Sequence, residues 1–236
     1  MVKEHCKKKL KVSSELTYIF SIILMAFSVA MITTTDFGVS MIVAPAYILS
    51  LKFNALTFGQ SEYIVQGILF IVLCIALKRI KLIYFCSFAT CLVYGAVLDT
   101  WRIIIPIFNP AITPVGSLPM VVRLIFFVLG MVLTSLSVAL FYKTYLYPQV
   151  YDFFVKAITS RYGFNATRFK IGFDFSCLAA ACLFTLVFFH RFEGVGIGTV
   201  VMTLLNGAII GMFTKLLDNN VEFVTLFPRL EKVFQI

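Results

Sequence analysis

Charged side chains are scarce in this sequence. Asp, Glu, Lys and Arg make up 13% of its 236 residues, against about 25% in a typical soluble domain, whereas hydrophobic residues make up 61%. So little polar surface cannot cover a folded globule in water, and the surplus apolar surface must face lipid. The composition therefore excludes a set of soluble domains and predicts one membrane-embedded bundle.

Groups that carry reactive chemistry are also few. The two histidines, His5 and His190, are expected outside the hydrocarbon, and no HExxH, Walker or Ser/His/Asp pattern is present. No CxxC or Cys/His zinc spacing occurs either, so we expect no metal site, no cofactor and no enzyme. Five of the six cysteines lie within hydrophobic runs, where thiols act as small apolar packing groups. The six are Cys6, Cys74, Cys86, Cys91, Cys177 and Cys182.

The hydrophobic residues gather in six continuous runs that each approach the roughly 20 residues a helix needs to cross a bilayer. Continuous runs favour helices over the alternating pattern of strands, so the predicted fold class is an all-α membrane protein with about six transmembrane helices. The first run lacks an A-x-A-like cleavage site after it, and we expect it to remain as a span. The runs cover residues 16–35, 57–77, 82–101, 124–142, 171–189 and 195–214.

Two shorter apolar segments predict short helices. Residues 41–51 contain Pro45 and are too short to cross, which indicates a re-entrant or interfacial helix. Residues 149–160 place apolar side chains at helical spacing, with Asp152 and Lys156 on the other side, as in an amphipathic helix at the membrane surface.

The basic residues predict the orientation. With the N-terminus in the cytoplasm, sixteen of the 20 Lys and Arg residues fall on inner segments, so both termini are expected to be cytoplasmic. This distribution explains the net charge of +9 better than nucleic-acid binding does. The expected organisation is a basic N-terminus (1–15), a membrane domain (16–217) and a C-terminal tail (218–236). The four outer residues are Lys52, Arg102, Arg123 and Arg191.

The order span, short helix, span, span occurs twice, over 16–101 and 124–214. The third and sixth spans align at a shift of 112 residues, which matches Gly95 to Gly207 within two rows of mostly small side chains. Three spans per half would give the halves opposite orientations, the plan of many secondary transporters. The alternative is that six spans divide evenly by chance. The two rows are Ser87, Cys91, Gly95, Asp99 and Thr199, Thr203, Gly207, Gly211.

Four polar residues within the runs are candidates for binding a substrate or a coupling ion: Asp174, Gln66, Asn206 and Asp99. A carboxyl or carboxamide in hydrocarbon must be paired, wet or functional. Asp174 matches Gln66 at a shift of 108 residues.

Three of the four candidates also have a structural alternative. Asp174 can form a helix-surface ion pair with Lys170, Asn206 an interhelical hydrogen bond, and Asp99 an interfacial pair with Arg102. Glu62 is expected near the outer interface, facing a vestibule or water. The row Thr199, Thr203, Gly207, Gly211 predicts a helix-packing face, the functional alternative being a pore-lining or moving helix.

Several segments resemble the YczE/YyaS/YitT group of bacterial membrane proteins, whose activity is largely uncharacterised. The resemblance implies a multi-pass protein of the bacterial plasma membrane, is compatible with transport, and supplies no substrate. It covers about residues 15–217 and rests on GVSMIVAPAY at 38–47, LTFG at 56–59, NATRFK at 165–170, FEGVGIGT at 192–199 and LNG at 205–207.

The leading functional prediction is a transporter of a small solute or ion that works by alternating access. The alternatives are a non-enzymatic binding or accessory subunit of a larger membrane complex and a membrane sensor. The partners we expect are the lipid bilayer, the unidentified solute or ion, and either a second copy of the chain or another membrane subunit.

Overall fold

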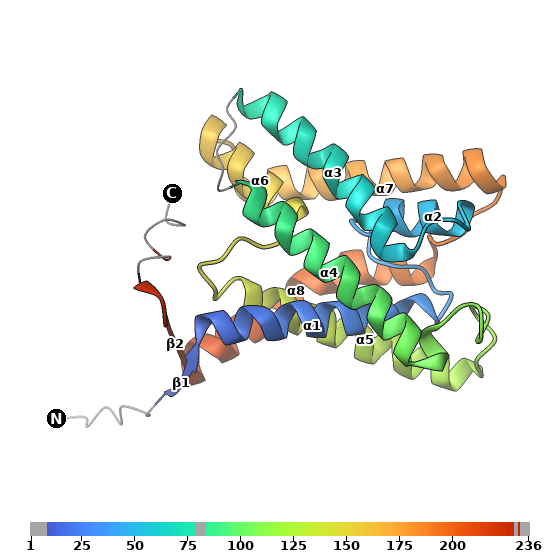
Figure 1. Cartoon of the computed structure of the whole chain (residues 1–236), viewed down its shortest axis with the longest axis horizontal. Coiled ribbons are helices and arrows are strands. Elements are labelled where there is room, and N and C mark those ends of the chain that lie inside the picture. Colours follow the sequence, from blue (N-terminus) through green and yellow to red (C-terminus); the bar gives the residue numbers. More distant parts are fainter. Residues whose placement is uncertain (1–8, 79–83, 229–230, 232–236) are drawn as a thin grey trace.

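The computed structural model describes residues 9–78, 84–228 and 231. Within those ranges the chain forms eight α-helices, one short 3₁₀ helix and two short strands (Figure 1). In chain order these are β1 (Leu10–Ser13), α1 (Ser14–Thr33), α2 (Ala44–Lys52), α3 (Phe58–Leu77), α4 (Phe85–Ile104), η2 (Pro106–Phe108), α5 (Met120–Phe141), α6 (Val150–Tyr162), α7 (Ala166–Phe189), α8 (Ile197–Asn220) and β2 (Val221–Val224).

Five helices, α1, α3, α5, α7 and α8, are long and apolar enough to cross a membrane. Their 20 to 24 residues correspond to roughly 30 Å or more of helix, which matches the hydrocarbon thickness. Ser13, Thr57 and Asn165 begin three of these helices, and each side chain accepts a hydrogen bond from the backbone N–H three residues later. The chain is therefore an integral membrane protein with mainly helical structure.

Helix α4 occupies the place of the expected third span. It has 20 residues, like α1 and α3, but its last two turns carry Asp99 and Arg102 and its apolar character is weaker than theirs. The structure therefore contains a helix at each of the six expected spans, and five of them meet the apolar criterion for crossing.

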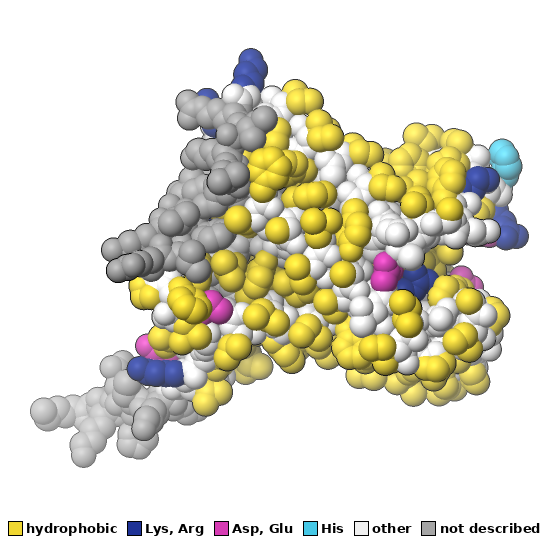
Figure 2. All heavy atoms as spheres, in the orientation of Figure 1, with side chains coloured by type: hydrophobic (Ala, Val, Ile, Leu, Met, Phe, Trp, Pro, Cys, Tyr) yellow, Lys and Arg dark blue, Asp and Glu magenta, His cyan; other side chains and the backbone are white. Residues whose placement is uncertain are grey.

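The outer surface of the helices is apolar. In Figure 2 hydrophobic side chains dominate the visible face, and most charged side chains lie towards its two ends. Few residues of α7 and α8 are fully buried within the chain, so much of these two helices faces either outward or the cavity described below. Such an exposed apolar belt is stable only against lipid or another apolar partner.

The helices pack in a definite order. Helix α1 lies between α4 and α5, α5 also packs against α8, and α3 packs against α4. The short helices bridge distant parts of the chain, because α2 contacts both α3 and α7 while α6 contacts both α3 and α7 (Figure 1). The consecutive helices α7 and α8 make at most marginal contact with each other.

Small polar side chains form the seam between α1 and α5. The Thr134 hydroxyl donates to Ser28 Oγ at 2.8 Å, and the Ser137 hydroxyl donates to the Ser21 carbonyl at 2.7 Å. Close approach with interhelical hydrogen bonds is how membrane helices associate when lipid already satisfies their apolar surface. This seam holds the two expected halves of the chain together.

The loop after α1 joins the start of α2 to the start of α8. The Gly198 N–H donates to the Phe37 carbonyl at 2.7 Å, and the Val39 N–H donates to the Gly194 carbonyl at 3.2 Å. Gly38 has φ +92°, and a Cβ there would collide with Thr199 Oγ1. Glycine is required because the backbone is left-handed and the neighbouring helix is in contact.

Both short helices pack against the long ones. Helix α6 is present as predicted, and its residues Val150, Phe153 and Ile158 are buried against the bundle, so this part of its apolar face contacts protein and not lipid. Asp152 pairs with Lys170 of α7 rather than with Lys156. Helix α2 starts at the expected proline and is buried over its first five residues.

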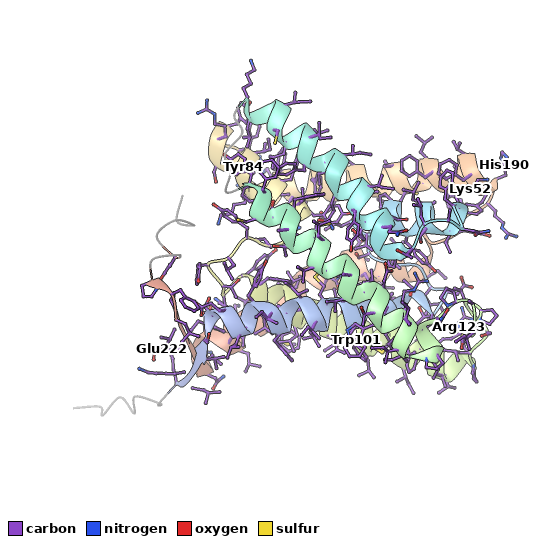
Figure 3. All side chains as sticks on the ribbon, in the orientation of Figure 1. Lys52, Tyr84, Trp101, Arg123, His190 and Glu222 are labelled. Carbon is purple, nitrogen blue, oxygen red and sulfur yellow. The ribbon has the colours of Figure 1, made fainter. Side chains whose placement is uncertain are left out.

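The two strands were not predicted. β1 and β2 pair in parallel, with Leu10 opposite Val221, and so join the two flanks of the membrane domain. Four-residue strands are too short to show a clear alternating pattern, and only the fold brings them together. Figure 3 shows Glu222 of β2 at one end of the molecule and Lys52, Arg123 and His190 towards the opposite end.

Several residues used for the predictions lie outside the described ranges. They are Lys3, His5, Cys6, Lys7, Lys8, Arg79, Lys81, Arg229 and Lys232.

Candidate functional site

A cavity of about 1040 Å³ lies among α5, α6, α7 and α8 and the two loops that precede the short helices. This volume is at the upper end of the range for small-molecule sites. Its accessible lining is mainly apolar, and polar side chains from several elements converge on it, as in many binding sites. The polar residues are Ser40, Thr134, Tyr142, Thr144, Tyr145, Gln149, Tyr151, Asp152, Lys156, Thr159, Ser160, Thr167, Lys170, Asp174, Thr203 and Asn206.

Two of the four predicted candidates line this cavity. Asp174 reaches it from α7 and Asn206 from α8. Asn206 Oδ1 accepts a hydrogen bond from the Ser135 hydroxyl of α5 at 3.3 Å, so the expected interhelical bond is present and the residue also borders the cavity. Its side-chain nitrogen has no hydrogen bond within the described residues.

A charged cluster occupies the part of the cavity between α6 and α7. Lys170 Nζ lies 3.2 Å from Asp152 Oδ1 and 3.8 Å from Asp174 Oδ1. The expected pairing of Lys170 with Asp174 is therefore present, but only as the longer contact, and Asp174 Oδ1 has no hydrogen-bond partner. The charge of Asp152, together with burial, raises the pKa of Tyr142 well above its usual range, so that hydroxyl remains neutral.

Gln66 does not line the cavity, but its hydrogen bonds connect it to the start of α6, which does. Its amide nitrogen donates to Glu62 Oε2 at 2.9 Å and to Gln149 Oε1 at 3.1 Å, and its oxygen accepts from the Val150 N–H at 3.2 Å. These bonds join α3 to the start of α6. Gln149 and Tyr151 are the cavity residues that complete this network, and neither was predicted.

Glu62 is not near water, and its expected position at an outer vestibule is wrong. Its exposed fraction is zero, and Tyr151 Oη donates to its Oε2 at 3.1 Å. Burial raises the pKa of Tyr151 far above its ordinary value, so the hydroxyl stays protonated and remains a donor. The local pattern placed Glu62 one turn from the end of a span, whereas the packing of α6 against α3 covers it.

Asp99 does not line the cavity, and its hydrogen bonds join α4 to the start of α3. Its carboxylate accepts from the Thr57 hydroxyl at 2.5 Å and from the Gly59 N–H at 2.9 Å, so it caps the first turn of α3. It forms no ion pair with Arg102, whose guanidinium lies over the Phe58 ring at 5.5 Å from the centroid. The expected interfacial pair of Asp99 and Arg102 is therefore wrong.

The row of small residues on α8 has three different environments. Thr199 is buried against the loop at Gly38, whereas Thr203 and Gly207 line the cavity. A Cβ added to Gly207 or Gly211 would meet no atom of the described chain within 4 Å. The packing partner expected for these two glycines is not supplied by the described part of this chain.

The cavity offers oxygen and nitrogen donors to a ligand. Within the described ranges, no three His, Cys, Asp or Glu side chains are grouped closely enough to hold a metal ion. The chemistry available is hydrogen bonding from Asn206 and Gln149, paired charges at Lys170, Asp152 and Asp174, and apolar contact.

Comparison with known sequences gives a family and no assigned activity. No curated protein and no solved structure matches the chain. One family model matches residues 12–215, which includes every residue of the cavity and all helices up to most of α8. The chain therefore belongs to the family of unknown function DUF6198.

Proposed function

We propose that this chain is a non-enzymatic transporter of a small solute or ion, built from two inverted halves, that binds its solute in the cavity between α6, α7 and α8. The proposal includes six spans, with α4 as the sixth, and a bacterial plasma-membrane location with both flanks in the cytoplasm. The likeness to the YczE/YyaS/YitT group and the unequal distribution of Lys and Arg support this location.

The contacts between helices support the inverted repeat. If α1 to α4 correspond to α5 to α8, the α1–α4 contact matches α5–α8, and the α2–α3 contact matches α6–α7. The contact of α2 with α7 likewise matches that of α6 with α3. The capping residues Thr57 and Asn165 are also related by the 108-residue shift that relates Gln66 to Asp174.

One contact breaks this correspondence, and it carries the proposal. Helices α3 and α4 are packed so closely that a Cβ on Gly59 would collide with the Gly95 carbonyl oxygen. The corresponding helices α7 and α8 are separated, and Gly207, the counterpart of Gly95, faces open space beside the cavity. Two equivalent helix pairs, one closed and one open, are what alternating access requires of inverted halves.

The cavity lining supports one state of the proposed cycle. The cavity is bordered by the start of α7, the end of α6 and the loop before α6, which contain Ala166, Ser160 and Thr144. These segments belong to the basic side that we propose to be cytoplasmic. We therefore assign the structure to an inward-open state, from which closing α7 on α8 while α3 separates from α4 would produce the outward-open state.

A ligand screen tests the proposal directly. Purified protein should be stabilised against heating by a subset of small solutes, because a ligand that binds only the folded state raises its stability. In Asp174→Asn and Asn206→Ala, the affinity for the same solutes should fall about tenfold or more, equivalent to roughly 1.4 kcal/mol of binding free energy or above. Flux of these solutes into proteoliposomes should fall in parallel.

Asp36→Asn is the matched control. The Asp36 side chain is 61% exposed and pairs with Arg123 away from the cavity, so binding and flux should be unchanged. If no solute is transported and the chain co-purifies with other membrane subunits, the chain is an accessory subunit. If flux occurs but ignores both cavity substitutions, the site is elsewhere.

A further inference from the structure

Glu62 is the most completely enclosed carboxyl of the described chain. Its exposed fraction is zero, and Oε2 accepts hydrogen bonds from Gln66 and Tyr151, whereas Oε1 has no partner. Within the described ranges, no Lys or Arg lies within ion-pair distance of it, although six ion pairs occur elsewhere. Nothing in its surroundings therefore balances a fixed negative charge.

The groups around Glu62 are neutral acids and amides. Helix α4 supplies Cys91, whose thiol lies 3.9 Å from the backbone carbonyl oxygen of Glu62. It also supplies Tyr94, which interacts electrostatically with Glu62, is fully buried and has a hydroxyl without a hydrogen-bond partner. Helix α6 supplies Tyr151. The titratable groups of α2 face other residues, because Tyr47 packs on Phe58 and Lys52 lies near Phe188.

We propose that Glu62 binds and releases the coupling proton of this transporter. An ionised carboxylate without a cation is costly in an apolar interior, and a proton removes that cost without needing a coordination shell. A larger cation would need several converging oxygens, whereas both Gln66 polar atoms are already used in hydrogen bonds.

The Glu62 carboxyl is linked to the cavity by two short paths. Tyr151 donates to Glu62 and lines the cavity, and Gln66 connects Glu62 to Gln149, which also lines it. When Glu62 gains or loses a proton, the hydrogen bonds that Tyr151 and Gln66 donate to it change. Both paths end on α6. Proton binding is thereby coupled to the position of α6, one wall of the cavity.

The inverted halves provide access to Glu62, and this step rests on the proposed function. At the 108-residue shift, Glu62 corresponds to Lys170, which borders the open cavity between α7 and α8. Opening of α3 from α4 would expose Glu62 in the same way on the other side. In the inward-open state Glu62 communicates with the cavity only through Tyr151 and the Gln66–Gln149 bond, and in the outward-open state it would be exposed directly.

Infrared titration of the full chain in nanodiscs tests the proton site without any solute. The wild type should show a protonated-carboxyl band that disappears with rising pH, and Glu62→Gln should lack this band. Asp36→Asn should retain it. A band that is unchanged in Glu62→Gln would overturn the proposal.

Distances across the cavity mouth test the coupling. Spin labels at Arg161→Cys on α6 and Leu216→Cys on α8, both exposed positions, are introduced into a background without native cysteines. The wild-type distance distribution should shift with pH, and Glu62→Gln should keep the acid distribution throughout. If Glu62→Gln does not fold, Tyr151→Phe should keep the carboxyl band but lose at least half of the distance shift.

These outcomes separate the two proposals. A solute flux that does not depend on pH or on Glu62 contradicts proton coupling and leaves the transporter intact. A Glu62-dependent band and distance shift without any solute flux supports the proton site and contradicts the transporter. A pH-dependent distance shift that survives in Glu62→Gln overturns the proton site.

Discussion

A polar side chain in a membrane helix can stabilise the fold or serve a ligand, and the two roles differ in how fully its atoms are bonded. Both oxygens of Asp99 accept hydrogen bonds from the first turn of α3, which leaves it little capacity for a ligand. Asp174 Oδ1 has only a distant ammonium, and Asn206 makes one long bond, so both retain capacity on the cavity side.

Asp99 is therefore expected to affect stability and not solute recognition. Asp99→Ala removes the acceptor for the Gly59 N–H and the Thr57 hydroxyl, which should cost about 2 kcal/mol of unfolding free energy, or a few degrees in the thermal midpoint. Asp36→Asn, at an exposed ion pair, should cost less than about 1 kcal/mol. Thermal unfolding in detergent measures both. Equal losses in the two variants would contradict the capping role.

At this scale, a role could be predicted when it depends on residues nearby in the sequence, and not when it depends on a contact with a distant segment. Asp174 and Asn206 were found because a polar group in a hydrophobic run is a local signal. Gln149 and Tyr151 were missed because they matter only once α6 folds back over α3, more than 80 residues away in sequence. Glu62 was misplaced for the same reason, since its burial comes from that long-range contact.

At the scale of elements, hydropathy predicted which segments form helices but not which helices pack against each other. All six long runs and both short segments became helices, because length and apolar content are properties of each segment. Nothing in the sequence of either segment predicts that α7 and α8 are separated. Both helices are apolar, yet α7 packs against α2 and α6 whereas α8 packs against α5.

The glycines of α8 should differ in their response to alanine. A Cβ on Gly198 would lie 2.6 Å from Phe127 Cε2 and 2.7 Å from the Phe37 carbonyl oxygen, so Gly198→Ala should lower the unfolding free energy by about 1–3 kcal/mol. Gly211→Ala meets no atom of the described chain and should be neutral or raise stability by up to roughly 1 kcal/mol, because alanine favours helix. Thermal unfolding of the purified variants distinguishes the two cases.

A destabilising effect of Gly211→Ala would have a specific meaning. It would show that the exposed small face of α8 packs against something beyond the described chain, as the sequence pattern predicts for a helix-packing face. Size-exclusion chromatography with light scattering of the same variant would then show whether that partner is a second copy of the chain.

For the whole molecule, the asymmetry between the two helix pairs implies a second conformation. Gly59 and Gly95 allow α3 and α4 to touch, and the residues at the matching positions of α7 and α8 are Thr167 and Gly207. Both are exposed beside the cavity, so these two positions leave room for α7 to approach α8.

A disulfide between cysteines introduced at Thr167 and Gly207 should therefore trap α7 and α8 in the closed arrangement. In a background without native cysteines, oxidation of Thr167→Cys with Gly207→Cys should yield an intramolecular disulfide in membranes, because closure brings the two Cα atoms to the roughly 4.4–6.8 Å that the bond requires. Flux of a solute identified by the ligand screen should stop on oxidation and return on reduction, while each single-cysteine variant remains active. If both cysteines react with a maleimide but never with each other, α7 and α8 stay apart, and alternating access through this pair fails.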